Sequence, residues 1–207
     1  FQTFGGTGDK IEGVAQKGSI ITEINNIKDG VKIAAKSGHI QIAAGTDPDA
    51  AKNLKGLATL SYFAEQINSQ LTTSTNANAN VYNAISFGGA SSASTGTSNT
   101  SAMKISLVSN VKSVIPGIFV DLADGSLKDN KAFLEAQIAK DLEAVAYVDR
   151  HAAAATATAT VQNSAGTDLE KRTPAYSTPV TTAGSETISD GKFIIYFKDF
   201  GADEVVK

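Results

Sequence analysis

The chain has 207 residues, enough for one domain with a sizeable core or for two small ones. Its 18 Lys and Arg residues against 21 Asp and Glu give a net charge of −3, which excludes a nucleic-acid binder that works by bulk positive charge. The absence of Cys and the presence of only two His, His39 and His151, exclude disulfide scaffolding, thiol chemistry and zinc sites of the usual ligand types.

The N-terminal third predicts a long amphipathic helix over residues 9–36. Apolar side chains recur at steps of three and four along one face, at Ile20, Ile24, Ile27, Val31 and Ala34. Gly13 and Gly18 weaken the first part of this helix by about 1 kcal/mol each relative to Ala. Lys36 in the last turn and Gly38 just beyond it predict where the helix stops.

A second helix is expected over residues 47–71. Asp47 is its candidate N-cap, Pro48 takes the first helical position and Asp49 lies in the first turn. The apolar positions keep helical spacing, at Ala50, Leu54, Leu57, Leu60, Ala64, Ile67 and Leu71.

Polar, low-complexity sequence follows at 72–80 and 88–101, which predicts exposed loops around a short apolar stretch at 81–87. Strand character is then indicated around Ile105 and Leu107, and again in the β-prone run 115–120. Pro116 interrupts that run, so we expect a sheet edge or a bulge there.

A third helix is expected over 129–149, capped by Asp129 or Asn130. Its apolar stripe comprises Leu134, Ile138, Leu142, Val145 and Val148. Alternating Ala and Thr at 152–161 favour a strand of small residues. Residues 162–190 are again polar.

The last expected element is a strand at 192–200, introduced by the turn signal Asp190-Gly191, with Phe193, Ile195 and Phe197 on one face. The order helix, helix, strands, helix, strands predicts an α+β fold with a largely antiparallel sheet. We expect one domain over 1–207, in which the helix of 1–38 packs on an α+β head formed by 39–207.

Several short motifs resemble ligand sites, and each has a simpler interpretation. Gly5–Lys10 is rich in glycine but lacks the spacing and the Ser or Thr of a phosphate loop, so residues 1–8 are expected to be irregular. Asp47 with Asp49, and Asp121 with Asp124, resemble fragments of a cation site. Acidic residues are also common in helix caps and turns, and this is the simpler interpretation of both pairs.

The remaining polar clusters do not predict catalysis either. Glu135, Asp141 and Glu143 are interpreted as a solvated helix face, and Asp149-Arg150-His151 as the C-terminal turn of that helix. Asn99-Thr100-Ser101 matches a glycosylation acceptor by chance in a Ser/Thr-rich loop. We therefore expect no catalytic, cofactor-binding or metal-binding residues, no cofactor, and a protein that is not an enzyme.

Three segments resemble the type IV pilins, specifically the type IVb group. Residues 16–31 (QKGSIITEINNIKDGV) resemble the amphipathic second half of the pilin spine helix, 46–71 the linking segment, and 190–197 (DGKFIIYF) a late sheet strand. The resemblance implies a subunit of an extracellular, cell-surface filament that polymerises with itself through its N-terminal helix. The family's hydrophobic first half-helix and its usual C-terminal disulfide have no counterpart in this sequence.

The start at Phe1 is what we expect of a processed or trimmed product. The pilin resemblance implies contact with a membrane only through the missing N-terminal segment, and a host-cell surface or other bacteria as further partners. No nucleic acid is expected as a partner. Two alternatives stay open: a capsid or tail protein of a virus or phage, and a secreted binding module that uses the polar loops 72–101 and 162–190.

Overall fold

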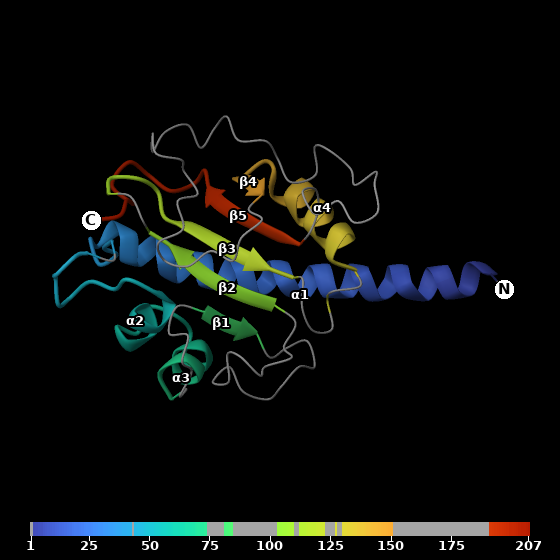
Figure 1. The fold of residues 1–207 in the computed structure, drawn as a ribbon, viewed down its shortest axis with the longest axis horizontal. Helices are drawn as coiled ribbons and strands as arrows, with labels where there is room; N and C mark the ends of the chain where they lie inside the picture. Colours follow the sequence, from blue (N-terminus) through green and yellow to red (C-terminus); the bar gives the residue numbers. More distant parts are fainter. Residues whose placement is uncertain are drawn as a thin grey trace.

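The computed structural model describes residues 2–42, 44–73, 81–84, 103–109, 112–122, 127, 130–150 and 191–207 (Figure 1). The helices are α1 (Gln2–Lys36), α2 (Leu54–Thr59), α3 (Glu65–Thr73) and α4 (Lys131–Leu142), and the strands are β1 (Val81–Ala84), β2 (Met103–Val108), β3 (Gly117–Asp121), β4 (Ala146–Arg150) and β5 (Lys192–Phe197). An N-terminal helix, an antiparallel sheet and further helices make this an α+β fold, as the sequence predicts.

The five strands form one sheet in the order β1-β2-β3-β5-β4, and every neighbouring pair is antiparallel. Successive side chains of a strand point to opposite faces, so each strand divides its residues between two sides. Residues of one face join the main core, among them Ile105, Leu107, Ile118, Val120, Phe193, Ile195 and Phe197. Val108, Phe119, Ile194 and Tyr196 form a second cluster on the other face.

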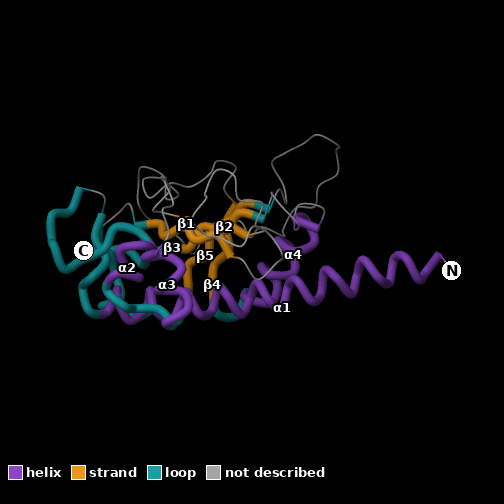
Figure 2. Tube along the Cα trace, turned by 90° about the horizontal axis from the view of Figure 1, so that it is seen from below, coloured by secondary structure: helices purple, strands orange, loops and turns teal. Residues whose placement is uncertain are grey.

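Helix α1 lies against the first of these faces (Figure 2). Its predicted apolar stripe, from Ile20 to Ala34, is fully buried in the main core. The predicted stop is also confirmed, because Lys36 ends the helix and Gly38 adopts the left-handed φ of 72° that glycine allows.

The helix begins earlier than predicted. Its backbone is helical from Gln2, so the expectation of an irregular segment at 1–8 is wrong. Three glycines in this stretch lower intrinsic helix propensity, but propensity is a weak prior that the continuation of an existing helix can override.

The single helix expected over 47–71 is wrong, because α2 and α3 replace it. Asn53, not Asp47, caps α2, and its Oδ1 accepts a hydrogen bond from the Gly56 N–H at 2.8 Å. The chain then turns at Ser61, whose φ is 63°. Asn68 stabilises the turn because its side chain binds both the N–H and the C=O of Phe63, at 3.1 and 2.7 Å.

The helix expected over 129–149 is also too long. Asn130 is the N-cap of α4, as predicted, but the helix ends at Leu142, and a turn leads into β4. Val148 is therefore a buried strand residue, and Asp149-Arg150 belong to a strand rather than to a helix C-terminus. Pairing of β4 with β5 supplies the backbone hydrogen bonds that a longer helix would have supplied.

Strand β3 lies between β2 and β5, so the sheet edge expected at Pro116 is wrong. Pro116 precedes the strand and removes no hydrogen bond from its ladder. The strand expected at 192–200 is confirmed as β5, which ends at Phe197. The strand expected at 152–161 and the loops expected at 88–101 and 162–190 lie outside the described residues.

Candidate functional site

Helix α1 has two parts with different surroundings. From Ile20 onward its inner face is buried on the sheet, whereas its N-terminal part extends past the sheet and past α4 (Figures 1 and 2). At a rise of about 1.5 Å per residue, its 35 residues span about 52 Å. The helix is thus considerably longer than the strands on which it packs.

Helix α4 holds α1 near the point where α1 leaves the head. Gly13 lies under the Phe133 ring, and a Cβ at Gly13 would come within 2.9 Å of the ring atom Cε1. Asn130 donates a hydrogen bond to Gln16 at 2.9 Å, and Lys17 forms a 3.0 Å ion pair with Asp141 of α4. Gly13, which weakens the helix in isolation, therefore makes room for this contact.

The turn after β5 provides a second attachment. The Lys28 and Lys32 ammonium groups lie 3.3 and 3.7 Å from the Asp199 carboxylate, and Lys32 also donates to the Asp199 carbonyl at 2.9 Å. The Lys28 ammonium lies 5.4 Å from the centre of the Phe197 ring, within cation–π range. These contacts fix one side of α1 to the end of the sheet.

A third attachment lies at Gly30, which faces the segment between α2 and α3. A Cβ at Gly30 would overlap the Phe63 ring and lie only 2.7 Å from the Tyr62 carbonyl oxygen. Because one of these atoms belongs to the backbone, the neighbour cannot move away cheaply. A glycine is therefore needed where this segment crosses α1.

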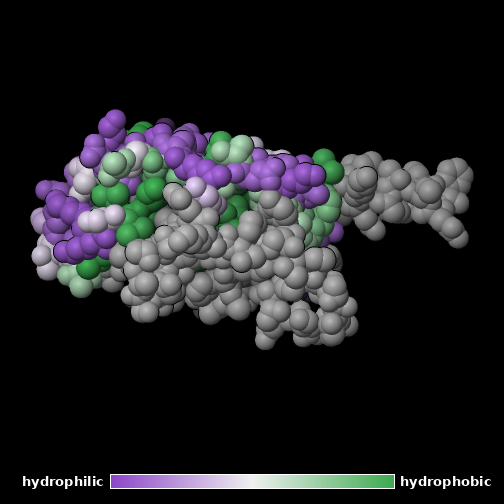
Figure 3. Space-filling model, turned by 90° about the horizontal axis from the view of Figure 1, so that it is seen from above, coloured by the Kyte–Doolittle hydropathy of each residue, from purple (hydrophilic) through white to green (hydrophobic). Residues whose placement is uncertain are grey.

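The outer face of α1 carries two large apolar side chains that are open to solvent. Val14 is 48% exposed and Ile33 is 57% exposed. Figure 3 shows mostly hydrophilic side chains along the edge where α1 runs, with hydrophobic side chains between them. The buried face of α1 is thus used within the chain, and its outer face is available to another molecule.

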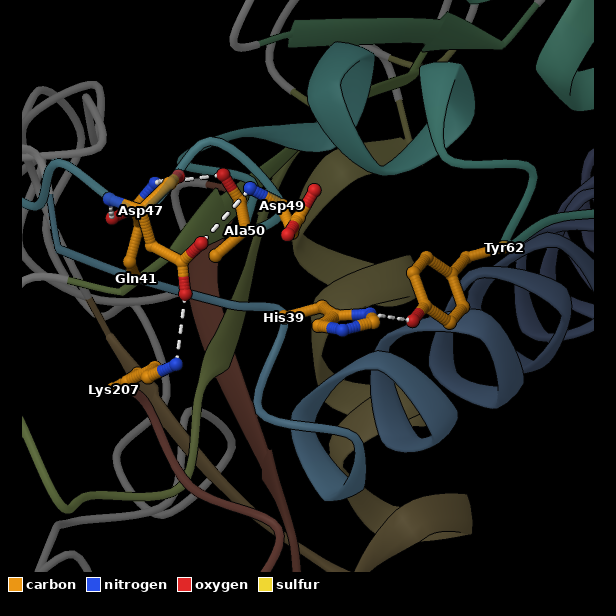
Figure 4. A network of polar contacts seen from close by, with 7 residues as sticks. All are labelled: His39, Gln41, Asp47, Asp49, Ala50, Tyr62 and Lys207. Carbon is orange, nitrogen blue, oxygen red and sulfur yellow. Dashed lines mark hydrogen bonds and ion pairs between the residues drawn. The ribbon is translucent and has the colours of Figure 1, made fainter.

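A polar network closes the other end of the molecule, in the loop of residues 39–51 (Figure 4). Its centre is Gln41, which is only 4% exposed. The Gln41 side-chain amide donates to the carbonyls of Asp47 and Ala50, both at 2.7 Å, and its Oε1 accepts from the Asp47 N–H at 2.9 Å. All three bonds run from one side chain to the loop backbone.

Four further side chains complete the network, in two pairs. Lys207 forms a 2.8 Å ion pair with Asp47, and the His39 ring is hydrogen-bonded to the Tyr62 hydroxyl. The Lys207 ammonium holds the pKa of the Asp47 carboxyl below its ordinary value, helped by the Asp49 N–H, which donates to Asp47 at 2.9 Å. The contacts of this network therefore stabilise the conformation of the loop.

The structure gives the acidic residues singled out from the sequence different roles. Asp47 binds the Asp49 N–H in a turn, as predicted for that pair. Glu135 is completely buried, so its assignment to a solvated face is wrong; its Oε2 accepts a hydrogen bond from the Gly191 N–H at 2.7 Å and so ties α4 to the start of β5. Asp121 is buried at the end of β3, and Asp124 lies outside the described residues.

Within the described ranges, no three His, Cys, Asp or Glu side chains come together in a group that could hold a metal ion. In the same part of the chain, no helix combines the length and the apolar character needed to cross a bilayer. Comparisons of the chain with protein-family models, with curated proteins and with solved structures found no match.

Analysis of the sequence missed Gln41, Tyr62 and Lys207 as organising residues. A glutamine between Ile40 and Ile42 suggests burial of its side chain only weakly, and nothing near Lys207 points to Asp47, 160 positions away. The outer face of α1, in contrast, follows directly from the helical period.

Proposed function

We propose that this protein is a structural subunit of an extracellular, cell-surface filament of the type IV pilus kind, and that it assembles through α1. The observation that carries the proposal is the division of α1 into a buried part and a part that extends beyond the head (Figure 1). A helix of this length gains most of its stability from packing, so an extended part is best used when a neighbouring subunit covers it.

The arrangement of the head supports the proposal. A single antiparallel sheet lies across α1, and α4, the α2–α3 segment and the turn after β5 each attach α1 separately. These attachments would transmit load from the helix to the whole head. This arrangement suits the pilin-like packing that the sequence resemblance implies.

In this proposal the main partner is a second copy of the chain. A host-cell surface or other bacteria would be contacted by the outer parts of the head, and a membrane only by a hydrophobic segment preceding α1. The protein would act without enzymatic activity and without a cofactor or nucleic acid. The Ser- and Thr-rich composition and net charge of −3 suit a surface exposed outside a cell.

The test is to express the complete gene, with its own upstream sequence, in its natural host and to image the secreted product by electron microscopy. Filaments with α1 toward the axis are the expected result. Closed icosahedral shells would instead support a virion protein, and a soluble monomer would support a secreted binding module. Either of these results would contradict the proposal.

Cysteine crosslinking identifies the assembly surface, because the chain contains no Cys of its own. Val14→Cys and Ile33→Cys place thiols on the outer face of α1, and Leu60→Cys and Val145→Cys, at 38% and 44% exposure, are matched controls on the head. We expect oxidation of assembled material to give disulfide-linked dimers with at least one α1 variant and with neither control. Dimers from the controls alone would contradict assembly through α1.

A further inference from the structure

We draw no further inference here: the strongest candidate, the apolar cluster of Val108, Phe119, Ile194 and Tyr196 on the face of the sheet opposite α1, is buried, and nothing in the described part of the chain shows what covers it.

Discussion

Helix α1 and the loop that follows it are held by different forces. The middle and C-terminal part of the helix packs its Ile-rich stripe on the sheet, and this contact depends on apolar burial, which is non-directional and is not weakened by charge screening. The loop that follows α1 is held by the directional bonds of Gln41 and by the exposed ion pair between Asp47 and Lys207. We call the Ile20–Ala34 stripe of α1 the spine, and the contacts of Gln41 and of Asp47 with Lys207 the polar closure. The spine is held by burial, whereas the polar closure includes an exposed ion pair that salt and acid can weaken.

The largest effect should come from placing a charge in the spine. Ile24→Asp puts a carboxylate at a completely buried position and should lower the free energy of unfolding by about 4 kcal/mol or more, or prevent folding. Ile33→Asp makes the same chemical change on the exposed face of the same helix and should cost less than about 1 kcal/mol. Denaturant unfolding followed by circular dichroism measures both. Equal stability of the two variants would contradict the assignment of the buried face.

A smaller effect is expected from a methyl group at the glycines of α1. Gly30→Ala should destabilise the protein by about 1–3 kcal/mol, because its Cβ would overlap Phe63 and the Tyr62 carbonyl. Gly18 has open space around it, so Gly18→Ala should stabilise the helix by up to about 1 kcal/mol. Thermal midpoints that shift in opposite directions confirm the comparison, and shifts in the same direction contradict it.

The polar closure should respond to acid where the spine does not. The pKa of Asp47 is lower in the folded than in the unfolded chain, so its contribution is fully present above the ordinary carboxylate pKa of about 3.9 and disappears as the pH falls through the folded value. The difference in thermal midpoint between wild type and Asp47→Asn should therefore be present at about pH 6 and shrink toward about pH 3. A difference that is constant over this range would contradict the ion pair.

The smallest effect is expected from metal removal. The described residues bring no three candidate ligand side chains together, so excess chelator should leave the circular dichroism spectrum and the thermal midpoint unchanged. A shift of several degrees, reversed by adding back a divalent cation, would show that acidic residues such as Asp121 participate in a metal site.

Local pattern predicted the spine well but placed other element boundaries poorly. The steps from Ile20 to Ala34 specify one helix face, and the buried face follows from them directly. Leu54, Leu57, Ile67 and Leu71 also show helical spacing and are also buried, yet two helices carry them. Periodicity reports which side chains are buried, but it cannot detect a turn between two helices that both face the same core.

The candidate site also has one part that the sequence predicts and one part that it does not. The outer face of α1 could be predicted, since it is the complement of the apolar stripe. The loop network could not, because it depends on contacts such as Lys207 with Asp47 that only the folded chain brings within 2.8 Å. Burial of Glu135 was missed for the same reason: its partner, the Gly191 N–H, lies 56 positions away.

Side-chain period and local turn chemistry are enough to predict the α+β class, the buried face of the first helix, its stop at Lys36 and the strand that contains Phe193. Long-range packing, in contrast, divides residues 47–71 into α2 and α3 and places Val148 in a strand. The same packing leaves room for no side chain at Gly13 and Gly30 of α1, where other segments cross the helix. Those outcomes depend on hydrogen bonds and close contacts between segments far apart in the chain, and no local pattern encodes such contacts.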